Sequence, residues 1–196
     1  IYYKMYSFKG GILMTKKVLI LAGDAVEALE IYYPYFRCVE EGYEVTIAAP
    51  TAKKLHTVVH DFIGWETYTE REGYLIEATA TFDEVNAADY DGLIIPGGRA
   101  PEHIRLNEKV PKLVSHFFET NKPIAAVCHA AQVLTTVKEH LNGRKMTAYI
   151  ACKPEVEAAG STYVSEPLHT DGNLVSGHAW PDLPGLMKEF ISQMNG

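Results

Sequence analysis

Short apolar runs alternate with amphipathic segments along most of this chain. Runs of strand length occur at 18–22, 92–95 and 124–127, and a turn and a helix-like pattern follow each of them. Uninterrupted apolar runs of this length are typical of strands that are buried on both faces of a parallel sheet. The alternation therefore predicts an α/β fold, a mainly parallel sheet with helices on both faces.

The same patterns predict the remaining elements. Further strands are expected at 44–49, 74–80 as an edge strand, 147–149, 161–165, and 169–177 with an Asp171-Gly172-Asn173 turn. Helices are expected at 26–41, 107–121, 154–159 and 183–194, and Pro34 should kink or break the first of them. Residues 50–73 are predicted to form a long irregular loop or insertion. With no repeat or linker, we expect one domain over 14–196 after an N-terminal extension at 1–13.

Composition narrows the class of protein. A net charge of −7 and the lack of a basic cluster argue against a nucleic-acid surface. No apolar run approaches the ~20 residues that a membrane span needs. Three widely spaced cysteines favour a reducing, cytoplasmic setting, and neither they nor the eight histidines show metal-ligand spacing. Neither dinucleotide-binding nor P-loop glycine motifs are present, so we expect no cofactor.

The main candidate for chemistry is Cys128, which follows the apolar run 124–127 and precedes a helix-forming segment at 130–138. A strand-to-helix turn exposes the residue at its apex, and the helix N-terminus stabilises an anion there, for cysteine the nucleophilic thiolate. Cys38 and Cys152 lack this setting and are predicted to be structural thiols. Side chains adjacent on a tight turn point apart, so we expect His129 to bind substrate or act through Glu102 rather than to be the direct base.

Two acids and a glycine turn lie beyond the ends of other predicted strands, where ligands bind in such sheets. Glu27 and Glu30 share a helix face within an apolar segment. Either they complement the helix dipole, or burial raises their pKa so that they can handle a proton beside Cys128. Gly97 and Gly98 offer unhindered backbone N–H groups, which could form an oxyanion hole together with the amide of Ala130. Among the other histidines, only His178 is placed near this cleft.

These motifs together resemble the ThiJ/PfpI superfamily of intracellular PfpI-type proteases, deglycases and glyoxalase III enzymes. The resemblance covers nearly all of the chain after Met14, and its most specific parts are the strings GLIIPGGRAPE at 92–102 and AVCH at 126–129. The segment 59–70 is more similar to the plant-type glyoxalase branch than to the short proteases.

The resemblance implies a flavodoxin-like sandwich, similar to class I glutamine amidotransferases, with Cys128 as nucleophile on a strained elbow. It implies that Glu30, with Glu27 beside it, hydrogen-bonds the cysteine. It also implies a dimer or hexamer, in which Glu102 of a neighbouring subunit completes a Cys-His-Glu triad. Two departures bear on the substrate: Ala130-Ala131 replace the usual glycine after Cys-His, and Trp180 could wall the cleft.

Three functions fit these residues. The first is a cofactor-free enzyme acting on small reactive carbonyls through Cys128 and a buried glutamate. The second is a peptidase or amidase using Cys128, His129 and Glu102 of a partner subunit. The third is a redox-sensing stress protein, because exposed cysteines of low pKa oxidise readily.

Overall fold

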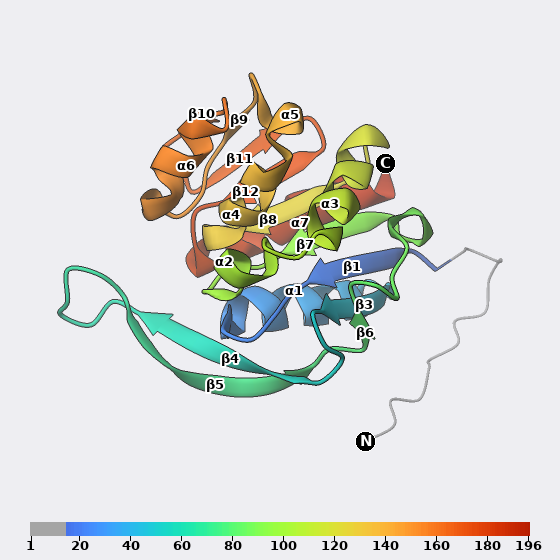
Figure 1. Cartoon of the computed structure of the whole chain (residues 1–196), viewed down its shortest axis with the longest axis horizontal. Coiled ribbons are helices and arrows are strands. Elements are labelled where there is room, and N and C mark those ends of the chain that lie inside the picture. The colour runs from blue at the N-terminus through green and yellow to red at the C-terminus, as the bar shows by residue number, and fades with distance from the viewer. Residues whose placement is uncertain (1–14) are drawn as a thin grey trace.

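The computed structural model describes residues 15–196, so the extension predicted at 1–13 lies outside the described residues. A seven-stranded sheet runs through the centre in the order β11-β12-β8-β7-β1-β3-β6 (Figure 1). Its strands are β1 (Lys17–Leu21), β3 (Glu44–Ala49), β6 (Ala80–Thr81), β7 (Gly92–Ile95), β8 (Ile124–Val127), β11 (Leu168–Asp171) and β12 (Leu174–Gly177). Within this sheet, as described over residues 15–196, only the β11–β12 pair is antiparallel, so the expected α/β sandwich with a mainly parallel sheet is confirmed.

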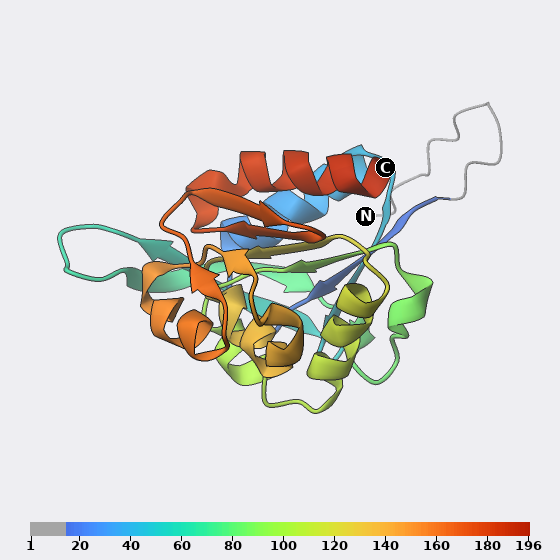
Figure 2. The ribbon, with the colours of Figure 1, turned by 90° about the horizontal axis from the view of Figure 1, so that it is seen from above.

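Helices cover both faces of this sheet (Figure 2). On one face lie α1 (Ala28–Glu40) and α7 (Leu183–Asn195). On the other face lie α2 (Ala100–Ile104), α3 (Lys109–Glu119), α4 (Ala131–Leu134), α5 (Lys138–Leu141) and α6 (Lys153–Ala158). Short 3₁₀ turns occur at η1 (Ala87–Asp89), η2 (Cys128–Ala130), η3 (Thr135–Val137), η4 (Ile150–Cys152) and η5 (Trp180–Asp182). None of the helices among residues 15–196 combines the length and the apolar character needed to cross a bilayer.

The buried side chains form two layers because neighbouring residues of a strand point to opposite sheet faces. Leu19 and Leu21 of β1 pack with α3 and α4, whereas Val18 and Ile20 pack with α1 and α7. All four side chains are fully buried. This two-sided burial explains why the strand was recognisable as an uninterrupted apolar run.

A second, smaller sheet corrects the irregular loop expected at 50–73. Strands β4 (Lys54–Asp61) and β5 (Thr69–Glu77) form an antiparallel hairpin, and β4 also pairs in parallel with β2 (Val26–Glu27). The predicted edge strand at 74–80 is therefore mostly part of β5, and β6 takes the edge of the main sheet. The hairpin projects from the body of the molecule (Figure 1).

Other expected boundaries also change. The first helix begins at Ala28 because Val26 and Glu27 pair with β4, and it continues through Pro34 to Glu40, so the expected break is wrong. The buried helix face at Ile31, Pro34 and Cys38 offsets the hydrogen bond that proline cannot donate. The strand expected at 147–149 lies earlier, at β9 (Lys145–Met146), which pairs with β10 (Thr162–Tyr163).

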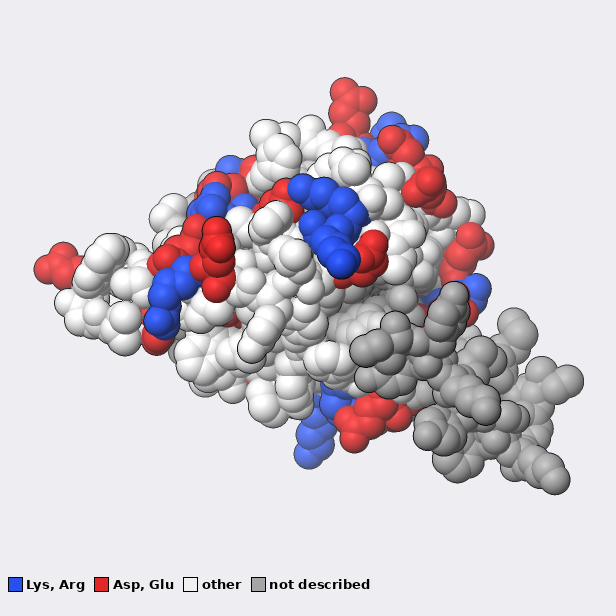
Figure 3. All heavy atoms as spheres, turned by 90° about the horizontal axis from the view of Figure 1, so that it is seen from below, with Lys and Arg blue, Asp and Glu red and all other residues white. Residues whose placement is uncertain are grey.

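The side of the molecule that carries the hairpin has a broad area of uncharged atoms between charged margins (Figure 3). Large apolar side chains are exposed on the hairpin and on α1, among them Tyr74, Leu75, Leu29 and Phe36. Exposed apolar surface of this kind is common at sites of protein association.

Candidate functional site

Cys128 lies at the turn that directly follows β8. Its φ is +61°, in the left-handed region that favours glycine. The 3₁₀ turn η2 begins at this residue and leads into α4, so the strand ends in an elbow. The side chain is 6% exposed, which places the sulfur at the base of a pocket rather than on the open surface.

His129 contacts the cysteine directly. Its Nδ1 lies 3.2 Å from Cys128 Sγ, so the expectation that the two side chains point apart is wrong. The 3₁₀ geometry of η2 brings the imidazole back over the elbow. Burial and the neighbouring His60 lower the pKa of His129 to about 4, so the ring is neutral at neutral pH and can accept a proton.

Glu30 is fully buried beside the cysteine. The Gly97 backbone N–H donates to its Oε2 at 2.8 Å, and Oε1 has no partner among the described protein groups. A Cβ on Gly97 would lie 2.7 Å from the Cys128 Cβ, so only glycine allows this close approach. Burial, reinforced by the charge of Glu27, raises the pKa of Glu30 to about 8. This carboxyl group therefore holds a proton at neutral pH.

The pKa of Cys128 is raised well above its usual value, first by burial and then by the negative charge of Glu30. The backbone N–H groups of Gly98 and His129 oppose this shift by hydrogen-bonding the sulfur. The expected thiolate stabilisation is thus outweighed by burial. The backbone N–H of His129, the second residue of the elbow, is one of the two donors to the sulfur. The oxyanion hole expected from Gly97, Gly98 and the amide of Ala130 concerns a substrate oxygen and stays a prediction.

Glu27 has a structural and a local electrostatic role. Its Oε2 accepts the Glu30 backbone N–H at 2.9 Å and so caps the N-terminus of α1. Its Oε1 is buried and has no hydrogen-bond partner within the described part of the chain, and burial raises the pKa of the Glu27 carboxyl. The cap agrees with the expected role at the helix N-terminus, and the raised pKa agrees with a buried carboxylate. The expectation that Glu27 handles a proton beside Cys128 stays a prediction.

Glu102 is exposed on α2. Within residues 15–196 it makes no hydrogen bond or ion pair to Cys128 or His129. Its expected contribution belongs to a neighbouring subunit, so that role stays a prediction.

The pocket above Cys128 also draws on residues that sequence reasoning did not assign to the site. Its lining consists of Glu27, Glu30, His60, Phe62, Tyr68, Cys128, His129, Tyr149, Ala179 and Trp180. Trp180 lines the cleft as expected. His178 is not among the residues that line it, and its ring centre lies 5.9 Å from that of Tyr149. His60, which was given no role, enters the pocket from β4.

A polar cluster fixes this part of the hairpin to the glycine turn. Arg99, next to Gly98, forms two hydrogen bonds to Glu70, with Nε at 2.7 Å and Nη2 at 2.8 Å. Glu70 Oε2 also lies 2.9 Å from His60 Nε2. The Arg99 contact and then the His60 contact hold the pKa of Glu70 down, at about 2. The sequence predicts this cluster only if residues 54–77 are recognised as a hairpin, because the hairpin is what brings His60 and Glu70 together.

No group of three or more His, Cys, Asp or Glu side chains in the described part of the chain is arranged to hold a metal ion. The pocket brings a thiol, a neutral imidazole and a protonated carboxyl together. Such a set can add a sulfur to an electrophilic carbon and move protons around it.

Comparison with known proteins gives concordant matches. The family model described as DJ-1/PfpI family matches residues 16–193. Protein DJ-1 homolog D of Arabidopsis thaliana is 41% identical over 187 residues, which cover 92% of this chain and 47% of that protein. This chain thus spans about half the length of that relative. A deglycase of Thermococcus kodakarensis is 38% identical over 175 residues, covering 89% of this chain and 97% of the deglycase.

A solved structure agrees with these sequence matches. A two-domain protein with DJ-1/ThiJ/PfpI-like and ferritin-like domains from Anabaena variabilis superposes with a TM-score of 0.83 at 31% identity. The match covers 92% of this chain and 48% of that one. The DJ-1 structure of Schizosaccharomyces pombe, 19% identical with a TM-score of 0.73 and 90% coverage of both chains, supports the fold alone.

Proposed function

This chain belongs to the DJ-1/PfpI family, and we propose that it is a cofactor-free, cysteine-dependent enzyme acting on small reactive carbonyls. The proposed reaction is that of a glyoxalase III or a deglycase. The observation that carries the proposal is the 3.2 Å contact between Cys128 Sγ and His129 Nδ1, next to the buried Glu30. Relatives named as deglycases support this class of reaction.

The first step follows from the protonation states. Neutral His129 accepts the thiol proton as Cys128 attacks the aldehyde carbon of methylglyoxal. The sulfur–carbon bond forms, and the carbonyl oxygen takes a proton to give a hemithioacetal. Glu30, which holds its proton at neutral pH, is placed to supply it. Transfer of the thiol proton to His129 is coupled to formation of the sulfur–carbon bond, so a free thiolate of Cys128 does not have to form first.

The remaining steps conserve oxidation state overall. The hemithioacetal isomerises to a thioester of lactate, and water then releases lactate and restores the thiol. The aromatic walls at Tyr68, Tyr149 and Trp180 restrict the pocket to small substrates and exclude bulk water from the intermediate.

The test is lactate formation from methylglyoxal without glutathione. We expect turnover by the wild type, and a loss of about 10³-fold or more in Cys128→Ala. Cys152→Ala is the matched control, because Cys152 is also a buried free thiol but does not line the pocket. Turnover that survives in Cys128→Ala contradicts the nucleophile. A folded wild type without any lactate formation contradicts the reaction.

A peptidase or amidase is the second candidate, because a cysteine–histidine contact also suits acyl transfer. It requires Glu102 from a partner subunit, and the exposed apolar side chains on α1 and the hairpin are a surface that a second copy could cover. Peptide-amide cleavage should then fall in Glu102→Gln at an unchanged oligomeric state. An unchanged rate would exclude the triad.

The redox-sensing alternative receives less support. Oxidation of a thiol follows its thiolate character and its exposure. Cys128 is 6% exposed, and burial raises its pKa. Mass spectrometry after mild peroxide treatment tests this alternative, which requires preferential oxidation of Cys128 over Cys38 and Cys152.

A further inference from the structure

The proposed carbonyl chemistry moves a second proton after the thiol has attacked. Isomerisation of the hemithioacetal removes a proton from the carbon bonded to sulfur and returns it to the neighbouring carbon. At that stage His129 carries the thiol proton, and Glu30 has given its own proton to the carbonyl oxygen. A third group in the pocket can carry the carbon-bound proton, an inference that rests on the proposed function.

His60 is a second histidine in the same pocket. Its side chain is 5% exposed and lines the cleft with Cys128 and His129. Its ring packs against Tyr68 with 4.3 Å between centres, and Tyr68 lies 5.8 Å from the His129 ring. The two histidines therefore face the pocket from different elements, β4 and the elbow, with an aromatic ring next to both.

Glu70 and Arg99 determine which nitrogen of His60 is free. His60 Nε2 lies 2.9 Å from Glu70 Oε2, and Arg99 binds both oxygens of the same carboxylate. An ionised carboxylate can only accept, so Nε2 carries the hydrogen. Nδ1 is then the acceptor, and it makes no hydrogen bond to any group within residues 15–196. A carboxylate behind a histidine fixes its tautomer and stabilises the imidazolium that forms.

We propose that His60, oriented by Glu70 and Arg99, is the general base that transfers the carbon-bound proton of the hemithioacetal. Nδ1 takes the proton from the carbon bonded to sulfur. The electrons of that C–H bond form a carbon–carbon double bond, and the neighbouring carbonyl becomes an enediolate oxygen. The hydroxyl proton then moves between the two adjacent oxygens. Finally Nδ1 returns its proton to the second carbon, which yields the thioester of a 2-hydroxy acid without any oxidant.

Kinetics of His60→Gln test this role. We expect kcat for methylglyoxal to fall about 10²-fold or more, with a small change in KM. With substrate deuterated at the aldehyde carbon, the isotope effect on kcat should rise, because C–H cleavage becomes slower than every other step. Imidazole in the buffer should partly restore turnover in His60→Ala. His56→Gln is the matched control, since His56 lies on the same strand but is exposed and outside the pocket.

The outcomes separate this inference from the proposed function. A wild type that makes lactate, with His60→Gln matching it in kcat and isotope effect, overturns the base and leaves the function intact. A loss of kcat without a larger isotope effect and without rescue by imidazole also overturns the base, because it indicates only a structural role.

A second readout does not require turnover. The ¹⁵N chemical shifts of the imidazole should show a protonated Nε2 and an unprotonated Nδ1 in the wild type, and a mixture of tautomers in Glu70→Gln. A protonated Nδ1 in the wild type overturns the assignment, even if methylglyoxal is not the substrate.

Discussion

A non-glycine residue at positive φ typically destabilises the folded state by about 1–2 kcal/mol. Cys128, at the base of the pocket, has such a positive φ. The strain aims the sulfur at His129 and the backbone donors of Gly98. Side chains held in such conformations persist only where their surroundings determine them. At Cys128 the buried strand β8 and the close-packed Gly97 supply those surroundings.

The strain predicts an unusual order of stabilities. Cys128→Gly should be more stable than Cys128→Ala by about 1 kcal/mol, because glycine adopts positive φ without a steric penalty. At Cys38, inside α1, the order should reverse, with the glycine variant less stable by about 1 kcal/mol. Urea denaturation of the four variants measures both differences. The same order at both sites would mean that the turn at Cys128 is not strained.

Glu30 predicts a distinctive dependence of stability on pH. Its folded pKa of about 8 lies above the unfolded value, so the folded state binds the extra proton between roughly pH 4.5 and 8. Its contribution to stability is complete below that window and is lost as pH rises towards 8. The free energy of unfolding of the wild type relative to Glu30→Gln should therefore fall, by at most about 1.4 kcal/mol per pH unit. Denaturation at pH 5 to 9 measures it, and a constant difference would contradict the raised pKa.

At the scale of elements, the ends of the parallel strands could be predicted, whereas the hairpin could not. Strands buried on both faces give continuous apolar runs, and these runs placed Cys128 and the Gly97 turn in the site. In β4 a register shift between His56 and Val58 breaks the two-residue alternation, and β5 is largely exposed and polar. The pocket residues of the hairpin were therefore missed. Tyr149 was missed because only tertiary contacts bring it to His129.

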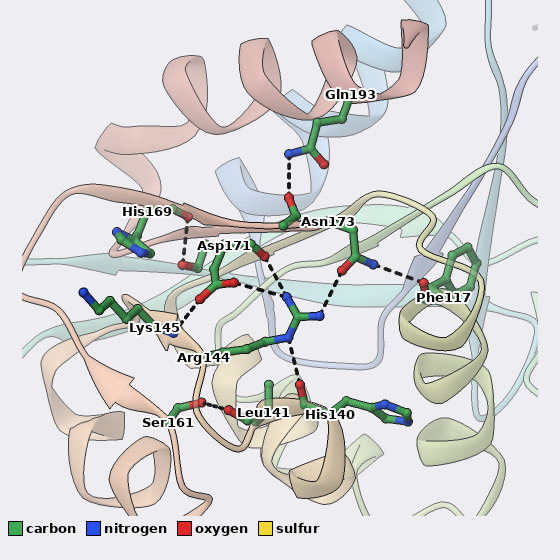
Figure 4. A network of polar contacts seen from close by, with 12 residues as sticks. Phe117, His140, Leu141, Arg144, Lys145, Ser161, His169, Asp171, Asn173 and Gln193 are labelled. Carbon is green, nitrogen blue, oxygen red and sulfur yellow. Dashed lines mark hydrogen bonds and ion pairs between the residues drawn. The ribbon is translucent and has the colours of Figure 1, made fainter.

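A polar cluster joins the β11–β12 hairpin to α5, to α3 and to the segment just before β8 (Figure 4). The Arg144 guanidinium donates to the backbone oxygens of His140 at 2.9 Å and Asp171 at 2.8 Å. The buried Asn173 side chain donates to the backbone oxygens of Phe117 at 3.1 Å and Lys122 at 2.8 Å. These contacts fix the antiparallel edge of the sheet against α3 and the start of β8.

Asn173→Ala should destabilise the fold by about 1–3 kcal/mol, because it removes the side-chain hydrogen bonds that the buried Asn173 amide donates to the carbonyl groups of Phe117 and Lys122. Gln193→Ala is the control from the same cluster: its contact to the Gly172 oxygen is exposed, and the change should stay within about 0.5 kcal/mol. Chemical denaturation compares the two variants. Equal effects would show that burial of the Asn173 contacts does not matter.

At the scale of the whole molecule, the sheet separates the core into two layers. Phe117 lies in the layer of α3, and Phe190 lies in the layer of α7 on the opposite face. Both side chains are fully buried. Each layer therefore contributes separately to the free energy of unfolding, because the backbone of the sheet lies between the two sets of side chains.

This separation predicts additive effects. Phe117→Leu and Phe190→Leu should each destabilise by about 1–3 kcal/mol, and the double variant should equal their sum within about 0.5 kcal/mol. Phe190→Leu with Met194→Ala is the contrasting pair, because both side chains pack on Gly92, and it should deviate from additivity. Chemical denaturation measures the free energy of unfolding of each variant. If the effects of Phe117→Leu and Phe190→Leu do not add, the two layers are coupled through the sheet.

The elbow at Cys128 is where this separation ends. Cys128 packs in the layer of α1 and α7, whereas Ala130, two residues later, packs in the layer of α3 and α4. During evolution, the core residues on one face of the sheet could be substituted without compensating substitutions on the other face. Substitutions next to the end of β8, in either layer, would displace Cys128. This short turn therefore limits which substitutions both halves of the core tolerate.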